Sequence, residues 1–196
     1  MSQAQKDGAP GASKVIAGLE EFATLHDLLY VLDKSTDGLP QVSVYSHDKL
    51  YRYAFARWWR AEDPLVLWVG LNPAKGDTEQ RRRPTLERCI AWSKEWRAGG
   101  LIVANLFAAR HNKPQALRGM ADPVGPHNDA VLRALSPIAE STVVAWGGND
   151  SLVRFRAAEI VRLLIKPRCL GITASGQPRH PLYVRADVPV RPWPVA

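Results

Sequence analysis

Residues 65–73 read Leu-Val-Leu-Trp-Val-Gly-Leu-Asn-Pro, an apolar run that ends at a glycine, an amide and a proline. Such a run is typical of a central strand in a parallel sheet, which is buried on both faces. The carboxyl end of such a strand is where α/β sheets bind ligands. We therefore expect Asn72 to face a substrate there, with Pro73 and Gly76 fixing the turn. An Asx turn that merely ends the strand is the alternative interpretation.

Three more segments have the pattern of strands, and each is followed by small or polar residues. They are residues 101–104, 142–146 and 169–173, and helices are predicted at 84–96, 128–135 and 152–165. This alternation predicts a three-layer α/β/α sandwich with a central, mainly parallel four-stranded sheet. The carboxyl ends of its strands would converge on one crevice.

The remaining segments are simpler to assign. Apolar residues at helical spacing predict an amphipathic helix over 15–33, a turn follows at 37–40, and segments 41–45 and 51–59 are β-rich or mixed. Residues 1–14 are expected to form a flexible tail, and residues 15–196 a single domain.

Composition narrows the class of protein. Lys and Arg number 26 against 19 Asp and Glu, a net charge of +7 that favours polyanionic partners, although solubility alone is an alternative explanation. Cys89 and Cys169 stand in apolar surroundings, which predicts reduced core thiols and excludes a four-thiolate iron–sulfur cluster. No apolar segment approaches the ~20 residues of a membrane span, and the N-terminus has no apolar leader. We expect a cytoplasmic monomer that needs no metal or cofactor.

Several short motifs occur in a fixed order between residues 48 and 193. They are Tyr51-Arg-Tyr, Leu71-Asn-Pro, Pro84-Thr-x-x-Arg-Cys89, Asn105-Leu-Phe-Ala-x-Arg110, Asp122-Pro-Val-Gly-Pro, Ala145-Trp-Gly and His180-Pro-Leu-Tyr183. With these motifs the chain resembles the DUF1643 family over most of its length.

A second resemblance, to the uracil-DNA glycosylase superfamily, rests on fewer residues. Gly70-Leu-Asn-Pro73 is similar to the first motif of that superfamily in its mismatch-specific branch, His180-Pro181 to the second motif in its uracil-specific branch, and Asn105 ends the intervening strand. The resemblance implies hydrolysis of the N-glycosidic bond of uracil in single- or double-stranded DNA after the base flips out of the stack.

The resemblance also implies a role for each residue. Asn72 would orient the attacking water, because an amide cannot deprotonate it, and His180 would donate as a neutral imidazole to the developing anion on uracil O2. Asp77 is a secondary catalytic candidate. Substrate contacts are expected from Gly70, Leu71, Asn105 and Phe107, and DNA contacts from Leu182 as a wedge and from Arg110, Arg179 and Arg185.

Each of these assignments has a structural alternative. His180 and Asn105 could cap a loop or helix, Leu182 and Phe107 could be core residues, and Arg81-Arg-Arg83 could be a solvated charge run.

The chain also departs from the uracil-specific pattern. The Asp and nearby Tyr of the first motif are replaced by Asn72 and Lys75-Gly76, and the Ser that usually follows His-Pro is Leu182. The alternatives therefore stay open: an enzyme of the same fold that acts on a modified base or nucleotide, a non-catalytic nucleic-acid-binding protein, or a nucleotide-binding protein without DNA contact.

Overall fold

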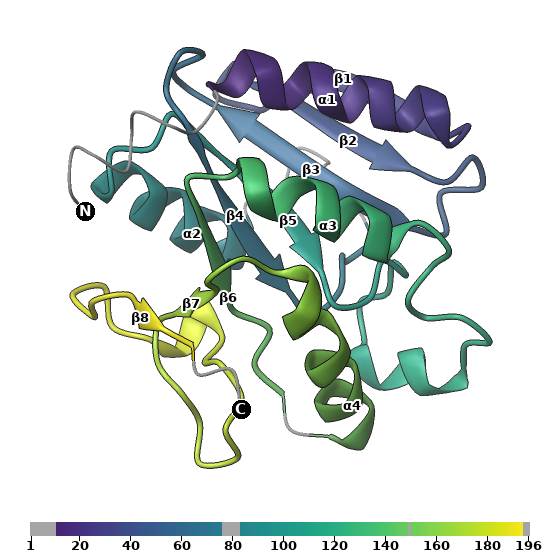
Figure 1. Ribbon diagram of the computed structural model, residues 1–196, viewed down its shortest axis with the longest axis vertical. Coiled ribbons are helices and arrows are strands. Elements are labelled where there is room, and N and C mark those ends of the chain that lie inside the picture. The colour runs from purple at the N-terminus through teal and green to yellow at the C-terminus, as the bar shows by residue number, and fades with distance from the viewer. Residues whose placement is uncertain (1–10, 76–82, 149, 194–196) are drawn as a thin grey trace.

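The computed structural model describes residues 11–75, 83–148 and 150–193 (Figure 1). In these residues eight strands form one sheet in the order β1-β2-β3-β5-β4-β6-β7-β8. Their bounds are β1 Leu29–Lys34, β2 Pro40–Tyr45, β3 Arg52–Trp58, β4 Leu65–Gly70, β5 Gly100–Asn105, β6 Ser141–Val144, β7 Arg168–Cys169 and β8 Arg191–Pro192.

The sheet is mixed. Strand β4 lies between β5 and β6 and runs parallel to both, and β7 is parallel to β6. Strands β1, β2, β3 and β5 pair antiparallel in succession, and β8 pairs antiparallel with β7. The predicted α/β class is confirmed at this coarse level, whereas the mainly parallel, four-stranded sheet is not: three antiparallel strands extend one side of the sheet, and β8 the other.

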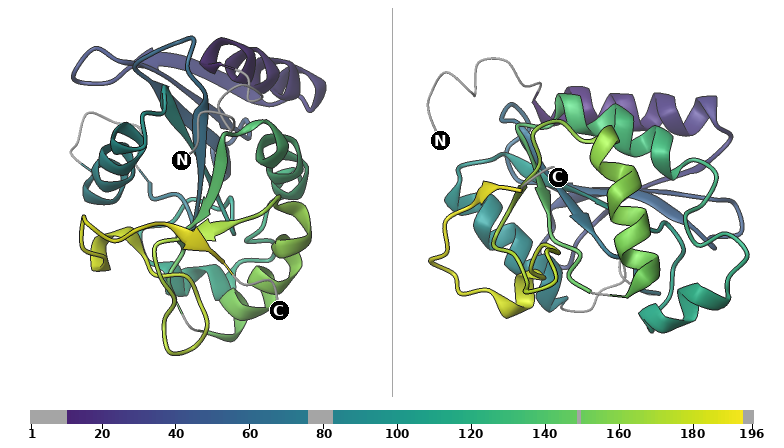
Figure 2. Two further views of the ribbon diagram at one scale, coloured as in Figure 1. Left: turned by 60° about the vertical axis from the view of Figure 1, so that its left-hand side comes forward. Right: turned by 60° about the horizontal axis from the view of Figure 1, so that its bottom comes forward.

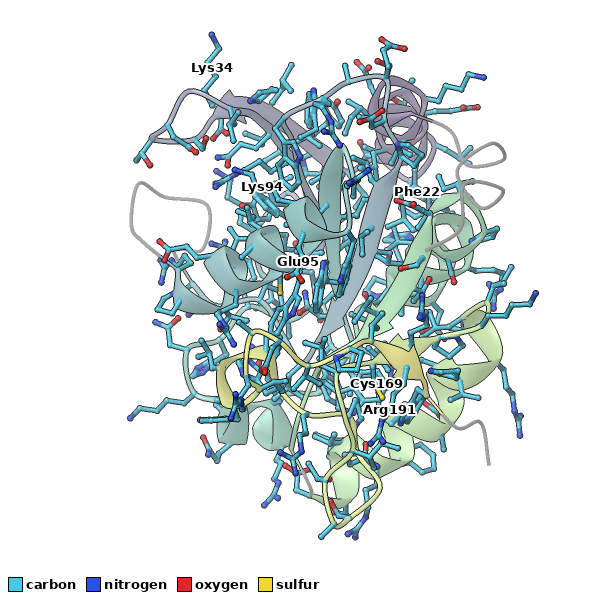
Figure 3. The ribbon with its side chains drawn as sticks, turned by 90° about the vertical axis from the view of Figure 1, so that its left-hand side faces the viewer. Phe22, Lys34, Lys94, Glu95, Cys169 and Arg191 are labelled. Carbon is cyan, nitrogen blue, oxygen red and sulfur yellow. The ribbon has the colours of Figure 1, made fainter. Side chains whose placement is uncertain are left out.

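Helices cover both faces of the sheet (Figure 2). Helix α1 (Ala12–Leu25), α3 (Asn128–Ile138) and α4 (Ser151–Ile160) lie on one face, and α2 (Pro84–Glu95) lies on the other. Figure 3 shows the two faces from the side: Lys94 and Glu95 of α2 lie on one side of the sheet, and Phe22 of α1 on the other. Short 3-10 helices η2 (Pro114–Gly119), η3 (Val161–Leu163) and η4 (Pro181–Tyr183) complete the fold.

Strand β4 shows why the apolar run at residues 65–69 is continuous. Successive side chains of a strand point to opposite faces of the sheet. Leu65, Leu67 and Val69 therefore pack in the core under α1, α3 and α4, while Val66 and Trp68 pack in the core under α2. Trp68 also donates a hydrogen bond to the Ser93 hydroxyl of α2 at 3.0 Å. Both faces need apolar side chains because both are covered.

The structure corrects three of the predicted segments. The helix expected over 15–33 ends at Leu25, and residues 29–34 form β1 instead. The strand expected over 169–173 is limited to Arg168–Cys169, and Gly171, whose φ is +136°, separates it from an isolated β-bridge between Ile172 and Pro178. Residues 12–14, expected to belong to a flexible tail, start α1, and residues 1–10 lie outside the described residues.

Two further observations bear on the class of protein. Cys89 and Cys169 are buried and form no disulfide. No helix in the described parts of the chain is long and apolar enough to cross a membrane.

Candidate functional site

A cleft of about 790 Å³ opens at the carboxyl ends of the parallel strands. Its lining includes the segment that follows β4 (Gly70–Asn72), the last residue of β5 (Asn105) and the segment that follows β6 (Ala145–Gly148). Arg179–Pro181 and the N-terminus of α2 complete the wall. The cleft therefore brings together Gly70, Leu71, Asn72, Asn105, Arg179 and His180 of the residues expected from the sequence.

The backbone fixes the orientation of the Asn72 amide. Its Nδ2 donates to the carbonyl oxygens of His111 at 2.8 Å and Pro73 at 3.1 Å, with a longer contact to that of Ala109 at 3.5 Å. The donor nitrogen is thus directed at backbone carbonyls of the 109–111 loop and of Pro73. Asn72 Oδ1 is the acceptor of this amide, and Asn72 is among the residues that line the cleft.

The amide nitrogen of Asn105, unlike that of Asn72, is not satisfied by the backbone. The residue is only 4% exposed, and its buried Nδ2 has no hydrogen-bond partner among the described residues. A buried amide without partners costs about 1–3 kcal/mol, so such a group in a cleft is a strong indication of a ligand. Gly70, the register partner of Asn105, lies against this amide: a Cβ at Gly70 would stand 2.8 Å from Asn105 Oδ1.

Two buried side chains hold the backbone at Asn105. Asn128, the first residue of α3, donates from Nδ2 to the carbonyl oxygens of Asn105 and Leu106, each at 3.0 Å. Arg156 of α4 donates from Nε to the Leu106 carbonyl at 3.0 Å and forms ion pairs with Asp129 and Glu159. The end of β5 is therefore anchored to both helices behind it.

His180 stands at the start of η4 and half-buried in the cleft wall. Its Nδ1 accepts from the backbone N–H of Leu182 at 3.4 Å, which places the proton of the neutral ring on Nε2. Burial lowers the pKa of His180 from its ordinary 6.5, so the imidazole is neutral at pH 7. Gly147 lies against the start of this side chain: a Cβ there would come within 2.9 Å of His180 Cβ.

The described part of the cleft lining has a distinct charge pattern. Arg52, Arg83 and Arg179 contribute guanidinium groups, and no Asp or Glu is among the lining residues. The 12-residue helix α2 also turns its N-terminus to the cleft through Pro84, and its N-cap makes no side-chain hydrogen bond. This end of a helix carries a partial positive charge, which adds to the preference for an anionic ligand.

The floor of the cleft is apolar. It includes Phe55, Trp68, Val103 and Trp146. Cys89 also lines it, but burial raises the pKa of this thiol well above its usual range, so it does not provide a thiolate nucleophile. An apolar floor with a few polar groups at the wall suits a planar ligand such as a nucleobase.

The structure places several of the expected site residues outside the cleft lining. Phe107 is 1% exposed, packs in the core under α1, α3 and α4, and is not among the residues that line the cleft. Arg110 is also absent from the lining: it donates to the Lys49 carbonyl at 2.9 Å and lies over the Tyr45 ring. Both side chains serve the packing of the strand-end loops.

The other expected residues lie at the rim or beyond it. Leu182 is 43% exposed on η4 but is not part of the cleft lining, and the exposed Arg185 forms an ion pair with Asp187 at 3.1 Å. Asp77, Gly76 and Arg81–Arg82 lie outside the described residues.

Two residues in the lining were missed by the sequence reasoning. Arg52 on β3 is buried, yet its side chain reaches the cleft. Tyr183, the last residue of the His-Pro-Leu-Tyr motif, is 79% exposed and borders the cleft. The sequence does carry a signal for both residues, since Arg52 is part of the Tyr-Arg-Tyr motif and Tyr183 of the His-Pro-Leu-Tyr motif.

The acidic and metal-binding side chains give no further site. Across residues 11–75, 83–148 and 150–193, no three His, Cys, Asp or Glu side chains are grouped closely enough to hold a metal ion.

Comparison with known proteins gives one match. The model of a family described as "Protein of unknown function (DUF1643)" matches residues 52–182, which is more than half of the chain. Comparisons with curated proteins and with solved structures give no significant match.

Proposed function

The chain belongs to the DUF1643 family, and from the contents of its cleft we propose that it hydrolyses the N-glycosidic bond of uracil in DNA. The observation that carries the proposal is the unpartnered Asn105 amide, which shares one cleft with Asn72 and His180. These three residues come from segments far apart in the sequence. Their types match the three tasks of the reaction: reading the base edge, orienting water and stabilising the leaving group.

The base edge is the task of Asn105. One side-chain amide offers a donor and an acceptor, which complements the O4 and N3–H of uracil. The buried and unpaired Nδ2 is the donor of such a pair. Because the residue lies deep in the cleft, the base leaves the DNA stack to reach it.

The bond cleavage is divided between Asn72 and His180. Asn72 Oδ1 accepts a hydrogen bond from water and orients its oxygen toward C1′. The C1′–N1 bond breaks with its electron pair passing to uracil, and water oxygen bonds to C1′. The neutral His180 donates from Nε2 to the negative charge that develops on O2. The water's proton leaves to solvent, and Asp77, which lies outside the described residues, stays a secondary catalytic candidate.

An alkali-cleavage assay tests this function. The protein is incubated with an oligonucleotide that carries a single uracil, treated with alkali, and analysed for strand scission. We expect scission, and a loss of at least about 100-fold in rate for Asn72→Ala and for His180→Ala. Gln115→Ala and His47→Ala are matched controls at exposed positions outside the cleft. No scission on single- or double-stranded DNA contradicts the function, and scission that survives the Asn72→Ala, His180→Ala double change contradicts the site.

A second candidate function is favoured by the guanidinium groups of the cleft. Arg52, Arg83 and Arg179 would suit the phosphate of a free nucleotide, and about 790 Å³ lies within the range of small-molecule pockets. This candidate would be supported over base excision if the protein binds a deoxynucleoside monophosphate but does not bind DNA. The affinity for the nucleotide should then depend on salt concentration only as much as contact with a single phosphate requires.

A further inference from the structure

A second, smaller groove of about 390 Å³ lies beside the cleft and is lined by residues between 170 and 191, in the C-terminal part of the chain. Arg179 and Tyr183 line both hollows, so the two adjoin at these side chains. Beyond them the groove is bordered by Arg185, Val188 and Arg191. Its last part, residues 183–191, lies past the stretch matched by the family model.

The groove has the composition of a nucleic-acid surface. Its lining contains three arginines and no Asp or Glu, namely Arg179, Arg185 and Arg191. Arg185 is partly neutralised by Asp187, whereas Arg191 forms no ion pair with a described residue. Arg191 lies on β8 opposite Cys169 of β7, and this pairing fixes its place beside the groove (Figure 3).

Tyr183 adds an exposed aromatic ring to the arginines of the groove. The Tyr183 ring is 79% exposed on the 3-10 helix η4, so its face is accessible to a partner. Its ring centroid lies 5.7 Å from that of His180, so it stands directly at the mouth of the cleft. Aromatic rings next to arginines are the means by which proteins bind unpaired bases, since every base has a face that stacks.

We propose that this groove binds a single strand of nucleic acid, with the base next to the one in the cleft stacked on Tyr183 and the following phosphates on Arg179 and Arg191. The inference deepens the proposed function and rests on it for the identity of the strand, the one whose base enters the cleft. Only an unpaired neighbouring base can offer its face to Tyr183. In a duplex this base is stacked within the helix. The preferred partner is therefore single-stranded.

Fluorescence anisotropy tests the groove without any base excision. A fluorescein-labelled 15-nucleotide oligonucleotide that contains no uracil is titrated alone and annealed to its complement, at several salt concentrations. We expect the single strand to bind at least about 10-fold more tightly than the duplex. Tyr183→Ala should weaken single-strand binding at least about 5-fold, while Tyr183→Phe retains it. Arg191→Ala should reduce the slope of log affinity against log salt by about 0.7.

A matched control separates the groove from overall charge. Arg133 is exposed on α3, on the opposite face of the sheet, and Arg133→Ala should leave binding unchanged. Equal or tighter duplex binding, wild-type affinity in Tyr183→Ala, or an equal effect of Arg133→Ala and Arg191→Ala would each overturn the inference. If the single strand binds in the expected pattern but no uracil is released in the alkali assay, the groove stands and the proposed chemistry fails. If uracil is released in the alkali assay but the single strand does not bind in the expected pattern, the groove proposal fails and the proposed chemistry stands.

Discussion

The side chain of Asn128 holds the backbone of Asn105: Nδ2 of the first lies 3.0 Å from the carbonyl oxygen of the second. The same Nδ2 lies 3.0 Å from the Leu106 carbonyl. Asn128 is fully buried at the start of α3, so the end of β5 is fixed relative to the helix behind the sheet. The geometry of the cleft amide thus depends on a residue that does not line the cleft.

Removal of this anchor should affect both stability and the cleft. Asn128→Ala removes the side-chain donor of the Asn105 carbonyl and leaves the Leu106 carbonyl with Arg156 as its side-chain donor. We expect the free energy of unfolding to fall by about 1–3 kcal/mol in urea denaturation. Uracil release should also slow, because the backbone that carries Asn105 can shift. Gln115→Ala, at an exposed amide, should change neither quantity. A stable Asn128→Ala protein would show that other contacts fix the end of β5.

Gly70→Ala should damage the cleft more than the fold. The new Cβ would meet Asn105 Oδ1 at 2.8 Å and push the amide out of place. We expect uracil release to drop at least about 10-fold, with a loss of about 1–3 kcal/mol in stability from overpacking. Gly119→Ala, where nothing lies within 4 Å of the added Cβ, is the control. Unchanged activity in Gly70→Ala would indicate that the Asn105 amide is free to move without consequence.

Gly147→Ala tests the support of His180. Gly147 has a φ of +62°, and a Cβ there would stand 2.9 Å from His180 Cβ. Gly38 has a similar φ of +78° but open space around it, so Gly38→Ala should cost only the backbone strain of about 1–2 kcal/mol. We expect thermal denaturation to show a larger loss for Gly147→Ala, and uracil release to fall only in that variant. Equal losses in both variants would mean that His180 adjusts without strain.

Acid should destabilise the protein through two histidines. Burial lowers the pKa of His180, and burial together with the nearby His26 lowers that of His127. Below the unfolded pKa of about 6.5 the unfolded chain therefore binds more protons than the folded one. The free energy of unfolding should decrease as pH falls from about 6.5 toward the folded pKa values, and should level off below them. Urea titrations between pH 7.5 and 5 measure this, and His127→Asn should reduce the slope. A stability that rises on acidification contradicts the assignment.

The sequence predicted the residues that end the central strands better than the extent of the sheet. Residues 65–69 are apolar on both faces because α2 and the other helices cover them, and this made the strand recognisable. Residues 29–34 were not recognised because Leu28, Leu29 and Leu32 continue the helical spacing of α1. Leu32 is exposed on the edge strand, so no core constraint marks the change from helix to strand.

Some of the cleft residues could likewise be predicted from the sequence, and others could not. Asn72, Asn105 and His180 could be expected together because strand ends in a parallel sheet meet at one edge. Phe107 and Arg110 follow the same strand as Asn105 but pack elsewhere, since the chain turns after Asn105 under the hydrogen bonds from Asn128 and Arg156. This turn is held by side chains 20 to 50 residues away in the sequence, so the local sequence pattern does not predict it.

The unpartnered Nδ2 of Asn105 is expected to favour ligand binding while it lowers the stability of the fold. Without a ligand, the folded protein carries a desolvated donor that the unfolded chain would give to water. A leucine of similar shape removes that penalty, so Asn105→Leu should melt at a higher temperature than the natural protein while losing its hold on the ligand. Selection for robustness alone would have replaced this residue. A higher melting temperature in Asn105→Leu together with lost binding would show that the cleft keeps this amide for its ligand at the expense of stability.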